Sequence, residues 1–462
     1  MEANEILAKA ESLRNGLSTG FRDEIVKSLY AEAENISKRA VKAATDKKYD
    51  FDQRIDRLVT SPYAGLPIML LLLSIIIWLT VTGANVVSAW IAVVLFGIGD
   101  FGRELFNQIG MPWWITGFVW DGVYLGLAWV VSVMLPPMMI FFPAFTFLED
   151  LGYLPRVAFN MDWMFKKTGA HGKQSLTMAM GFGCNAAGVI STRVIDSPRE
   201  RLIAILTNNF VPCNGRFPTL IMLATVFVAA SFPPGLTSLI AAATVVGVVL
   251  IGVGFTFAAS WILSRTVLKG EASAFTLELP PYRRPNVSRI LYTSIIDRTI
   301  FVLWRAMQTA APAGALIWVL ANIPVGDTSL AITISNWLNP FGLLLGLDGI
   351  ILLSYIIAIP ANEIVVPTMM MLYIGTGMMT NGPTNSTEIY NLLVYQNGWT
   401  MLTAINLMLF ALLHNPCATT IITIFKETKS YKWATLSVVM TLGTAIVVTF
   451  LTASIARFFG WG

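Results

Sequence analysis

Charged residues are scarce in this sequence. Only 13% of its 462 residues are charged, while 55% are hydrophobic and the mean hydropathy is +0.66. A soluble domain carries about 25% charged residues, so this chain lacks the polar surface that a water-soluble body needs. Its formal net charge of +4 is small and spread along the chain, which gives no sign of nucleic-acid binding. We therefore predict that most of the chain lies in a lipid bilayer.

Cysteine and histidine are rare, and nucleotide-binding motifs are absent. Three cysteines are too few for a disulfide framework in a chain of this length. A structural zinc site is disfavoured because there is no Cys-x-x-Cys pair and no close histidine pair. The sequence has no Gly-x-x-x-x-Gly-Lys-Ser/Thr loop, so we expect a transporter without a GTP site rather than an enzyme. We expect no cleavable signal peptide, because residues 1–60 are hydrophilic and lead directly into an apolar segment.

The apolar segments predict an all-α polytopic membrane protein with about eight spans. Residues 1–60 have apolar side chains at helical spacing and a basic later part, which predicts a short cytoplasmic helical segment. This segment is either a solvated amphipathic helix or a docking site for a soluble partner. The membrane part is divided into residues 61–300 and residues 301–462. In the first half we expect a span over residues 66–87 and a shorter segment, residues 88–99, that lies at the membrane interface.

The two halves are predicted to repeat one plan. Residues 174–192 and 342–379 are each expected to form a re-entrant hairpin that enters and leaves the membrane on one side. A span follows each hairpin and breaks at a Pro-Cys pair, residues 212–213 and 416–417. The distribution of lysine and arginine implies that these two spans run in opposite directions, which is the inverted-repeat arrangement of many transporters.

Polar residues concentrate where the apolar segments break. The run Met-Gly-Phe-Gly-Cys-Asn at 180–185 and the run Asn-Asn-Phe-Val-Pro-Cys-Asn-Gly-Arg at 208–216 combine glycine, proline, asparagine and cysteine. A backbone that breaks at membrane depth frees N–H and C=O groups, which must be buried in protein or line a wet cavity. We interpret this region as a permeation site. The alternative is tight helix packing, for which glycine and other small residues are suited.

Five side chains in these apolar segments are candidate ligands of a metal ion. They are Cys184, Cys213, Cys417, Glu363 and His414. A glutamate in a span costs about 3 kcal/mol on insertion scales, so it is a functional candidate unless it pairs with a basic neighbour. A single buried cysteine is usually a small hydrophobic residue, but all three lie at helix breaks beside asparagine or proline. Thiol and imidazole ligands favour a first-row transition metal over Mg²⁺ or Ca²⁺.

Oxygen-bearing side chains beside these ligands are predicted to line the substrate path. The candidates are Asn185, Asn214, Asn415, Asn209 and Glu149. Three of the asparagines directly precede or follow a cysteine or proline of a break, so their carbonyl oxygens would lie beside the sulfur atoms. Glu149 is the weaker candidate of the two carboxylates.

Several runs, in order, resemble one known family. They are Glu-Asp-Leu-Gly-Tyr-Leu-Pro-Arg-Val-Ala-Phe-Asn-Met-Asp at 149–162, Gly-Ala-His-Gly-Lys at 169–173, the run at 180–185, Pro-Cys-x-x-Arg at 212–216, Ala-Asn-Glu at 361–363 and Pro-Cys-Ala-Thr at 416–419. Over roughly residues 50–460 this order resembles the membrane domain of the bacterial ferrous iron transport protein B (FeoB) family. The resemblance implies two Gate repeats and import of Fe²⁺ across the cytoplasmic membrane of a bacterium or archaeon.

The resemblance also implies a GTPase. The family carries one on the N-terminal side of the membrane domain, whereas residues 1–50 here resemble only the helical linker. The nucleotide step is therefore expected from a truncated part or from a separate GTPase subunit. The other expected partners are membrane lipid and further copies of the chain, and no nucleic acid.

Two other functions remain open. Gate repeats resemble the halves of nucleoside transporters, so the chain could carry a small organic solute on the amides of Asn208, Asn209, Asn214 and Asn415. It could also be a non-transporting membrane assembly protein with residues 1–60 as its active surface.

Overall fold

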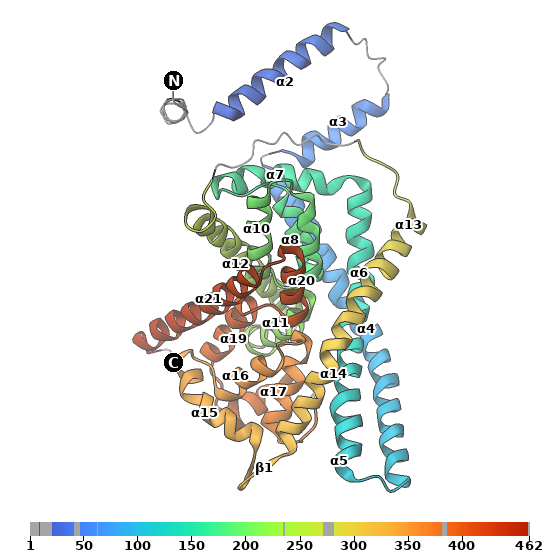
Figure 1. The fold of residues 1–462 in the computed structure, drawn as a ribbon, viewed down its shortest axis with the longest axis vertical. Coiled ribbons are helices and arrows are strands. Elements are labelled where there is room, and N and C mark those ends of the chain that lie inside the picture. Colours follow the sequence, from blue (N-terminus) through green and yellow to red (C-terminus); the bar gives the residue numbers. More distant parts are fainter. Residues whose placement is uncertain are drawn as a thin grey trace.

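The described part of the chain is almost wholly helical (Figure 1). The computed structural model describes residues 9, 21–40, 47–61, 63–233, 236–270, 281–380 and 386–460. Residues 1–8, 10–20 and 41–46 of the predicted N-terminal segment lie outside the described residues. The strands within these ranges are β1 (Pro324–Val325) and β2 (Thr328–Ser329), which form one short antiparallel hairpin. The predicted all-α fold is confirmed.

The number of membrane spans also agrees with the prediction. Among the described residues, seven helical stretches are long and apolar enough to cross a bilayer: Val86–Gln108, Trp113–Leu151, Pro198–Val228, Leu239–Arg265, Val287–Asn322, Met401–Thr428 and Tyr431–Phe458. The helices α15 (Leu330–Leu344) and α16 (Gly349–Ile357) meet at an angle of 110° and make an eighth span if they are counted together.

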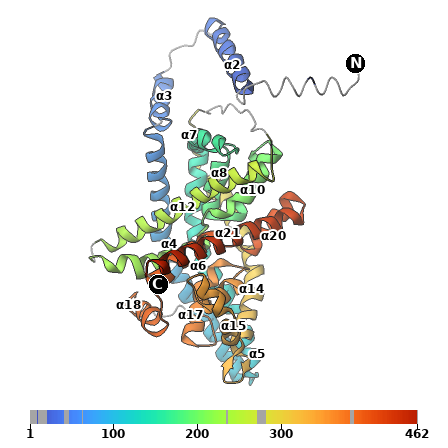
Figure 2. The same ribbon diagram turned by 90° about the vertical axis from the view of Figure 1, so that its left-hand side faces the viewer.

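Two helices, α2 (Phe21–Ala40) and α3 (Lys47–Val59), lie beyond one end of the membrane part (Figures 1 and 2). They confirm that the described part of residues 1–60 is helical; its cytoplasmic location remains a prediction. An ion pair attaches α3 to the next layer, because the Asp56 carboxylate accepts hydrogen bonds from Nε and Nη2 of Arg156, at 2.9 and 3.1 Å. The Arg156 side chain is only 1% exposed.

The first membrane helix, α4 (Gly65–Gln108), is longer than predicted. The prediction that residues 88–99 form a separate segment at the membrane interface is wrong, because α4 continues through these residues without interruption. No proline and no charge occurs between residues 68 and 99, so nothing in the sequence stops the helix there. Its 44 residues extend about 66 Å at 1.5 Å per residue, roughly twice the bilayer's hydrocarbon thickness.

The remaining elements of the first half surround a hairpin and a broken span. They are α5 (Trp113–Thr116), η1 (Gly117–Tyr124), α6 (Leu125–Leu151), α7 (Tyr153–Lys167), α8 (Gln174–Gly183), α9 (Asn185–Ser191), η2 (Thr192–Val194), α10 (Pro198–Thr207), η3 (Asn208–Phe210), η4 (Asn214–Arg216), α11 (Phe217–Leu223), η5 (Ala224–Val228), η6 (Ala229–Ser231) and α12 (Thr237–Arg265). The helices α8 and α9 pack against one another as predicted, and the span from α10 to α11 breaks between them at η3 and η4.

The second half repeats this series. Its elements are α13 (Val287–Tyr292), η7 (Thr293–Ile300), α14 (Phe301–Asn322), α15, α16, η8 (Asn362–Ile364), α17 (Val365–Ile374), α18 (Ser386–Tyr390), η9 (Asn391–Gln396), α19 (Met401–Leu413), α20 (Ala418–Thr428) and α21 (Tyr431–Phe458). Here α16 and α17 form the hairpin, and α19 and α20 form the broken span. The α8 hairpin lies in the upper part of Figure 1 and α16 and α17 in the lower part, as expected for hairpins that enter from opposite faces.

Glycine residues let the two halves approach closely. Gly122 and Gly126 lie one turn apart on η1 and α6, and Gly314 of α14 packs against both. A Cβ at residue 314 would lie only 3.1 Å from Cα of Gly126, so no larger residue fits without a shift. Small residues at such crossings are typical of helix packing in membranes, where backbones pack directly against each other. One hydrophobic core then continues through both halves.

Candidate ion path at the helix breaks

The hairpin of the first half turns at Cys184. This residue has extended backbone, with φ −154° and ψ 124°, between the end of α8 and the start of α9. Gly181 and Gly188, one on each helix, both lie against the side-chain amide of Asn208. The Asn208 amide donates a hydrogen bond to the carbonyl oxygen of Asn185 at 3.1 Å. The two glycines therefore leave room for an amide that holds the break together.

The broken span of the first half contains Cys213. Pro212 has no N–H, so the helical hydrogen-bond pattern stops there and Cys213 takes an extended conformation at the start of η4. Both Cys184 and Cys213 are buried and free. The break falls at the residues predicted from the sequence.

In the second half, two breaks lie side by side. The hairpin breaks at Pro360 and Ala361, ahead of Glu363, and the span breaks between α19 and α20 at residues 414–417. A hydrogen bond joins the two breaks, because the N–H of Ala418 donates to the carbonyl oxygen of Ile359 at 2.8 Å. The Cys417 sulfur lies 3.3 Å from Oγ1 of Thr420, one turn further along α20.

The side chain of His414 is held by its surroundings. Its Nδ1 lies 3.1 and 3.0 Å from the carbonyl oxygens of Phe410 and Ala411, so this nitrogen carries the hydrogen. Its ring stacks on Phe410 and meets the edge of Tyr355 at 4.7 Å between centroids. The remaining nitrogen, Nε2, faces the Asn362 side chain at 3.4 Å. His414 therefore points toward the residue that precedes Glu363.

The candidate ligands gather around these breaks. The carboxyl group of Glu363, in the second half, packs directly on Gly215, in the first half; a Cβ built on Gly215 would lie 2.7 Å from Cδ of Glu363. Cys213 lies two residues before Gly215, and α9, which begins directly after Cys184, packs against α20, which begins directly after Cys417. Among the described residues, no three His, Cys, Asp or Glu side chains are close enough to form a ready-made metal cage. The structure thus brings the candidates into one region without closing them around an ion.

The side-chain amides of Asn209 and Asn185 form hydrogen bonds with residues of other segments. The Asn209 amide donates to Oγ of Ser437 on α21 at 2.7 Å. The Asn185 amide, turned toward the carbonyl oxygens of Gly181 and Val211, donates to them at 3.1 and 3.2 Å. These contacts give both residues a structural role at the break. The amide of Asn415 donates to the adjacent Pro416 carbonyl, at 3.3 Å, within its own break.

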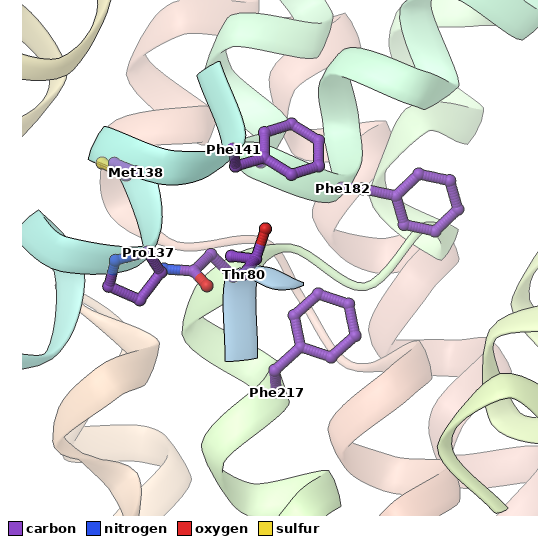
Figure 3. A pocket seen from close by; sticks show the side chains of 8 residues that line it. Thr80, Pro137, Met138, Phe141, Phe182 and Phe217 are labelled. Atoms are coloured by element: carbon purple, nitrogen blue, oxygen red, sulfur yellow. The ribbon is translucent and has the colours of Figure 1, made fainter. Parts of the chain in front are cut away.

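Asn214 has a different position, because it lines a narrow gap. The side chains labelled in Figure 3 line the same gap from α4, α6, α8 and α11. The gap has a volume of about 10 Å³, which is room for about one water molecule. Its other lining residues are Thr80, Pro137, Met138, Phe141, Phe182, Gly183 and Phe217. Bulky apolar side chains therefore narrow the space beside Asn214.

Glu149 lies away from the breaks. It is at the end of α6, half-exposed, and forms an ion pair with Arg298 at 3.1 Å. Arg298 also contacts Oγ1 of Thr146 at 3.0 Å and Sδ of Met180 at 3.9 Å. A cavity of about 420 Å³ opens here, and its lining includes Thr146, Glu149, Asp150, Arg283, Arg289 and Arg298. The structure thus places Glu149 in a charged recess outside the cluster of thiols, with Arg298 linking it to the start of the 180–185 run.

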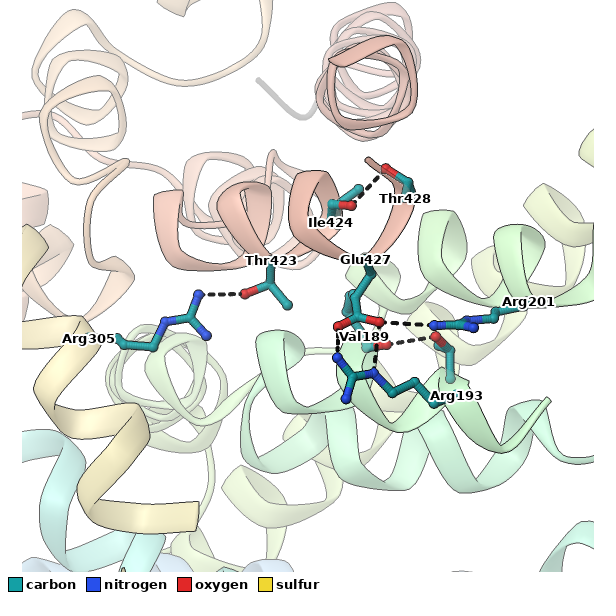
Figure 4. A network of polar contacts seen from close by, with 9 residues as sticks. Val189, Arg193, Arg201, Arg305, Thr423, Ile424, Glu427 and Thr428 are labelled. Carbon is teal, nitrogen blue, oxygen red and sulfur yellow. Dashed lines mark hydrogen bonds and ion pairs between the residues drawn. The ribbon is translucent and has the colours of Figure 1, made fainter. Parts of the chain in front are cut away.

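A cluster of ion pairs joins the two halves at Glu427 of α20 (Figure 4). Nε and Nη2 of Arg193 donate to its two carboxylate oxygens at 2.9 and 2.6 Å, and Arg201 donates to one of them at 2.9 Å. Both arginines belong to the first half, and the Glu427 side chain is only 6% exposed. Sequence reasoning did not single out this contact, since its partners are more than 220 residues apart.

Arg216 is the principal residue at the breaks to which the sequence assigned no role. Its side chain is 1% exposed and donates to backbone carbonyl oxygens of both broken spans, including Asn209 at 2.9 Å and Leu412 at 2.7 Å. The signal was available, because an arginine inside an apolar segment is a functional candidate by the same reasoning that selected Glu363.

The fold and these breaks define a class of protein: a polytopic α-helical membrane protein with two regions, each made of a hairpin and a broken span. Comparison with known families gives the same division. The family model named Gate, described as "Nucleoside recognition", matches residues 131–227 and 303–431, which contain the two sets of hairpin and broken span. The model described as "Ferrous iron transport protein B C terminus" matches residues 245–297.

Curated relatives cover most of the chain. The "Fe(2+) transporter FeoB" of Staphylococcus aureus (strain MSSA476) is 28% identical over 474 residues, which cover 99% of this chain and 68% of the relative. The protein of the same name from Campylobacter jejuni is 28% identical over 91% of this chain and 68% of its own length. No solved structure matches the chain. Over nearly its whole length the chain is therefore similar to FeoB transporters, and the matches are consistent with their membrane part.

Proposed function

We propose that this chain forms the path by which ferrous iron crosses the cytoplasmic membrane, with the thiols of Cys184, Cys213 and Cys417 and the carboxylate of Glu363 as successive or shared ligands. The observation that carries the proposal is the contact of Glu363, from the second half, with Gly215, next to Cys213 of the first. The relatives named "Fe(2+) transporter FeoB" support ferrous iron as the transported ion.

The chemistry of the cluster suits an ion in transit. Thiolate sulfur and a carboxylate favour a first-row transition metal, and a hard ion would require more oxygen ligands than these side chains offer. Metal binding to a thiol releases a proton, so affinity depends on pH and can change during transport. Because the ligands come from two halves and form no closed cage among the described residues, an ion is held only while the halves stay in contact.

The proposal extends to the energy source and the orientation. A GTPase outside this sequence drives or gates the path, since no P-loop occurs in these 462 residues. The N-terminal helices lie in the cytoplasm, as the basic residues around Lys38 and Arg39 favour.

The alternative of a nucleoside path receives less support from the contacts. It would rely on free amides at the breaks, whereas the amide nitrogens of Asn208 and Asn209 already donate to Asn185 and Ser437. It also leaves the three cysteines without a role.

The test is anaerobic uptake of Fe²⁺ by proteoliposomes that contain the purified protein. Cys184→Ser and Glu363→Ala should each lower the initial rate at least tenfold. The control is Glu104→Gln, which removes an exposed carboxylate of α4 and should leave uptake unchanged. Normal Fe²⁺ uptake by both path variants would remove these residues from the path, and saturable nucleoside uptake without metal uptake would favour the alternative.

A further inference from the structure

A buried arginine connects the two broken spans. The guanidinium of Arg216 donates through Nη1 to the carbonyl oxygens of Asn209 (2.9 Å) and Leu412 (2.7 Å). Through Nη2 it donates to those of His414 (3.0 Å) and Asn415 (3.5 Å). One side chain of the first half thus binds a set of backbone oxygens drawn from both halves.

Proline explains why these oxygens are available. In a regular helix the carbonyl of Leu412 would accept from the residue four positions later, but that residue is Pro416, which has no N–H. Asn209 lies in the 3₁₀ turn η3, where a carbonyl accepts from the residue three positions later. That residue is Pro212, which also has no N–H. The last carbonyls of a helix also carry partial negative charge. The two breaks therefore create a group of unpaired, inward-facing oxygens that requires a cation or a donor.

Arg216 is the cation that meets this requirement. Among the described residues, no ion pair joins it to a carboxylate, and the hydrogen bonds from its two Nη atoms go to backbone carbonyl oxygens, while Nε has no partner there. A cage of backbone carbonyls is also the means by which channels bind alkali cations in place of water. The guanidinium therefore occupies a space with the ligand chemistry of a Na⁺ or K⁺ site.

We propose that Arg216 is a specificity-determining residue that fills, as a tethered cation, a carbonyl site for alkali ions at the junction of the two breaks. This inference rests on the proposed function, since it explains how a path for a transition metal excludes the far more abundant Na⁺ and K⁺. With the oxygen site filled, the groups left for a mobile ion are the thiols and Glu363, which favour a softer ion. The fixed charge also repels any cation that lacks those ligands.

The test compares Arg216→Gln with Arg216→Lys in the purified, detergent-solubilised protein. Thermal unfolding is measured in choline chloride, NaCl and KCl at equal ionic strength. Arg216→Gln removes the charge, so it should be destabilised in choline chloride and regain several degrees of Tm in NaCl or KCl. The wild type and Arg216→Lys, whose ammonium still fills the site, should respond equally to all three salts.

Transport supplies a second measurement. Proteoliposomes with Arg216→Gln should take up ²²Na⁺ or ⁸⁶Rb⁺ at least tenfold faster than those with the wild type or Arg216→Lys. If Arg216→Gln is unfolded in all three salts, or is folded but neither stabilised by alkali ions nor permeable to them, the proposal is wrong. The Tm measurement does not depend on iron transport. Normal Fe²⁺ uptake by both Cys184→Ser and Glu363→Ala would overturn the proposed path without changing the outcome for the carbonyl site.

Discussion

The contact between Gly215 and Glu363 allows the role of the carboxylate to be tested without removing it. Gly215 lies in η4 with a backbone conformation that alanine can adopt. The added methyl would lie 2.7 Å from Cδ and 3.3 Å from Cγ of Glu363, whereas ordinary contact begins near 3.4 Å. The carboxyl group must therefore move by about 1 Å, and we expect Gly215→Ala to displace Glu363 while leaving its charge intact.

The expected effects on stability and on transport differ in size. Crowding in a packed interior costs about 1–3 kcal/mol, at the low end here because the crowded atoms end a flexible side chain. Replacing glycine with alanine also stabilises by about 0.4–1 kcal/mol through the unfolded chain. The net change in the free energy of unfolding should therefore stay within about 1 kcal/mol. A ligand displaced by about 1 Å can cost up to 100-fold in rate, so Fe²⁺ uptake should fall at least tenfold.

The assay pairs initial rates of anaerobic Fe²⁺ uptake with Tm in detergent. Gly247→Ala is the matched control, since a Cβ there meets nothing within 4 Å and both measurements should stay at wild-type values. The double variant Gly215→Ala with Glu363→Asp shortens the crowded side chain. Its fold loss of Fe²⁺ uptake should be smaller than the product of the fold losses of the two single variants. Wild-type uptake by Gly215→Ala, or a loss of uptake that simply follows a loss of folded protein, would refute the reasoning.

Two further predictions concern contacts away from the breaks. Asp56→Asn leaves the buried Arg156 without its carboxylate partner. Loss of one member of a fully buried pair costs about 3–5 kcal/mol of unfolding free energy. Because Asp56 is partly exposed, we expect a loss of about 2 kcal/mol, measured as a lower Tm. Burial works to raise the pKa of Asp56, but hydrogen bonds and charge from Arg156 outweigh it and hold the pKa below its ordinary value. The stabilisation should be complete above about pH 4 and disappear as the pH falls through the folded-state pKa, so wild type and Asp56→Asn should converge in Tm at acidic pH. Glu427→Gln weakens the contacts with Arg193 and Arg201 and should cost about 1–2 kcal/mol, whereas Lys426→Gln, at an exposed neighbouring residue, should leave Tm unchanged.

The helix breaks could be predicted from the sequence because their causes are local. Pro212, Pro360 and Pro416 each remove a backbone donor inside an apolar segment, and each marks a break in the structure. The continuity of α4 was missed for the opposite reason. Residues 88–99 look too short to cross a membrane alone, and only the absence of a helix-breaking residue before them shows that they extend the preceding span.

The contacts across the two halves could not be predicted in the same way. Which oxygens Arg216 would bind depends on how α19 packs against η4, and residues 216 and 412 are far apart in the sequence. The same holds for Glu427 with Arg193. Local patterns identify residues that need a partner in the membrane, and the packing of the two halves decides which partner each one finds.

The two halves repeat one series of elements but contribute different chemistry to the junction. The first supplies Cys184, Cys213 and the guanidinium of Arg216; the second supplies Glu363, Cys417 and most of the carbonyl oxygens. Adjacent residues, Gly215 and Arg216, contact two different elements of the second half, η8 and the end of α19. A movement of η4 relative to the second half must therefore change the position of Glu363 and the carbonyl contacts of Arg216 together. In the proposed path, an ion held by Cys213 and Glu363 would bridge the same two halves, so its binding would be coupled to the closure of this junction.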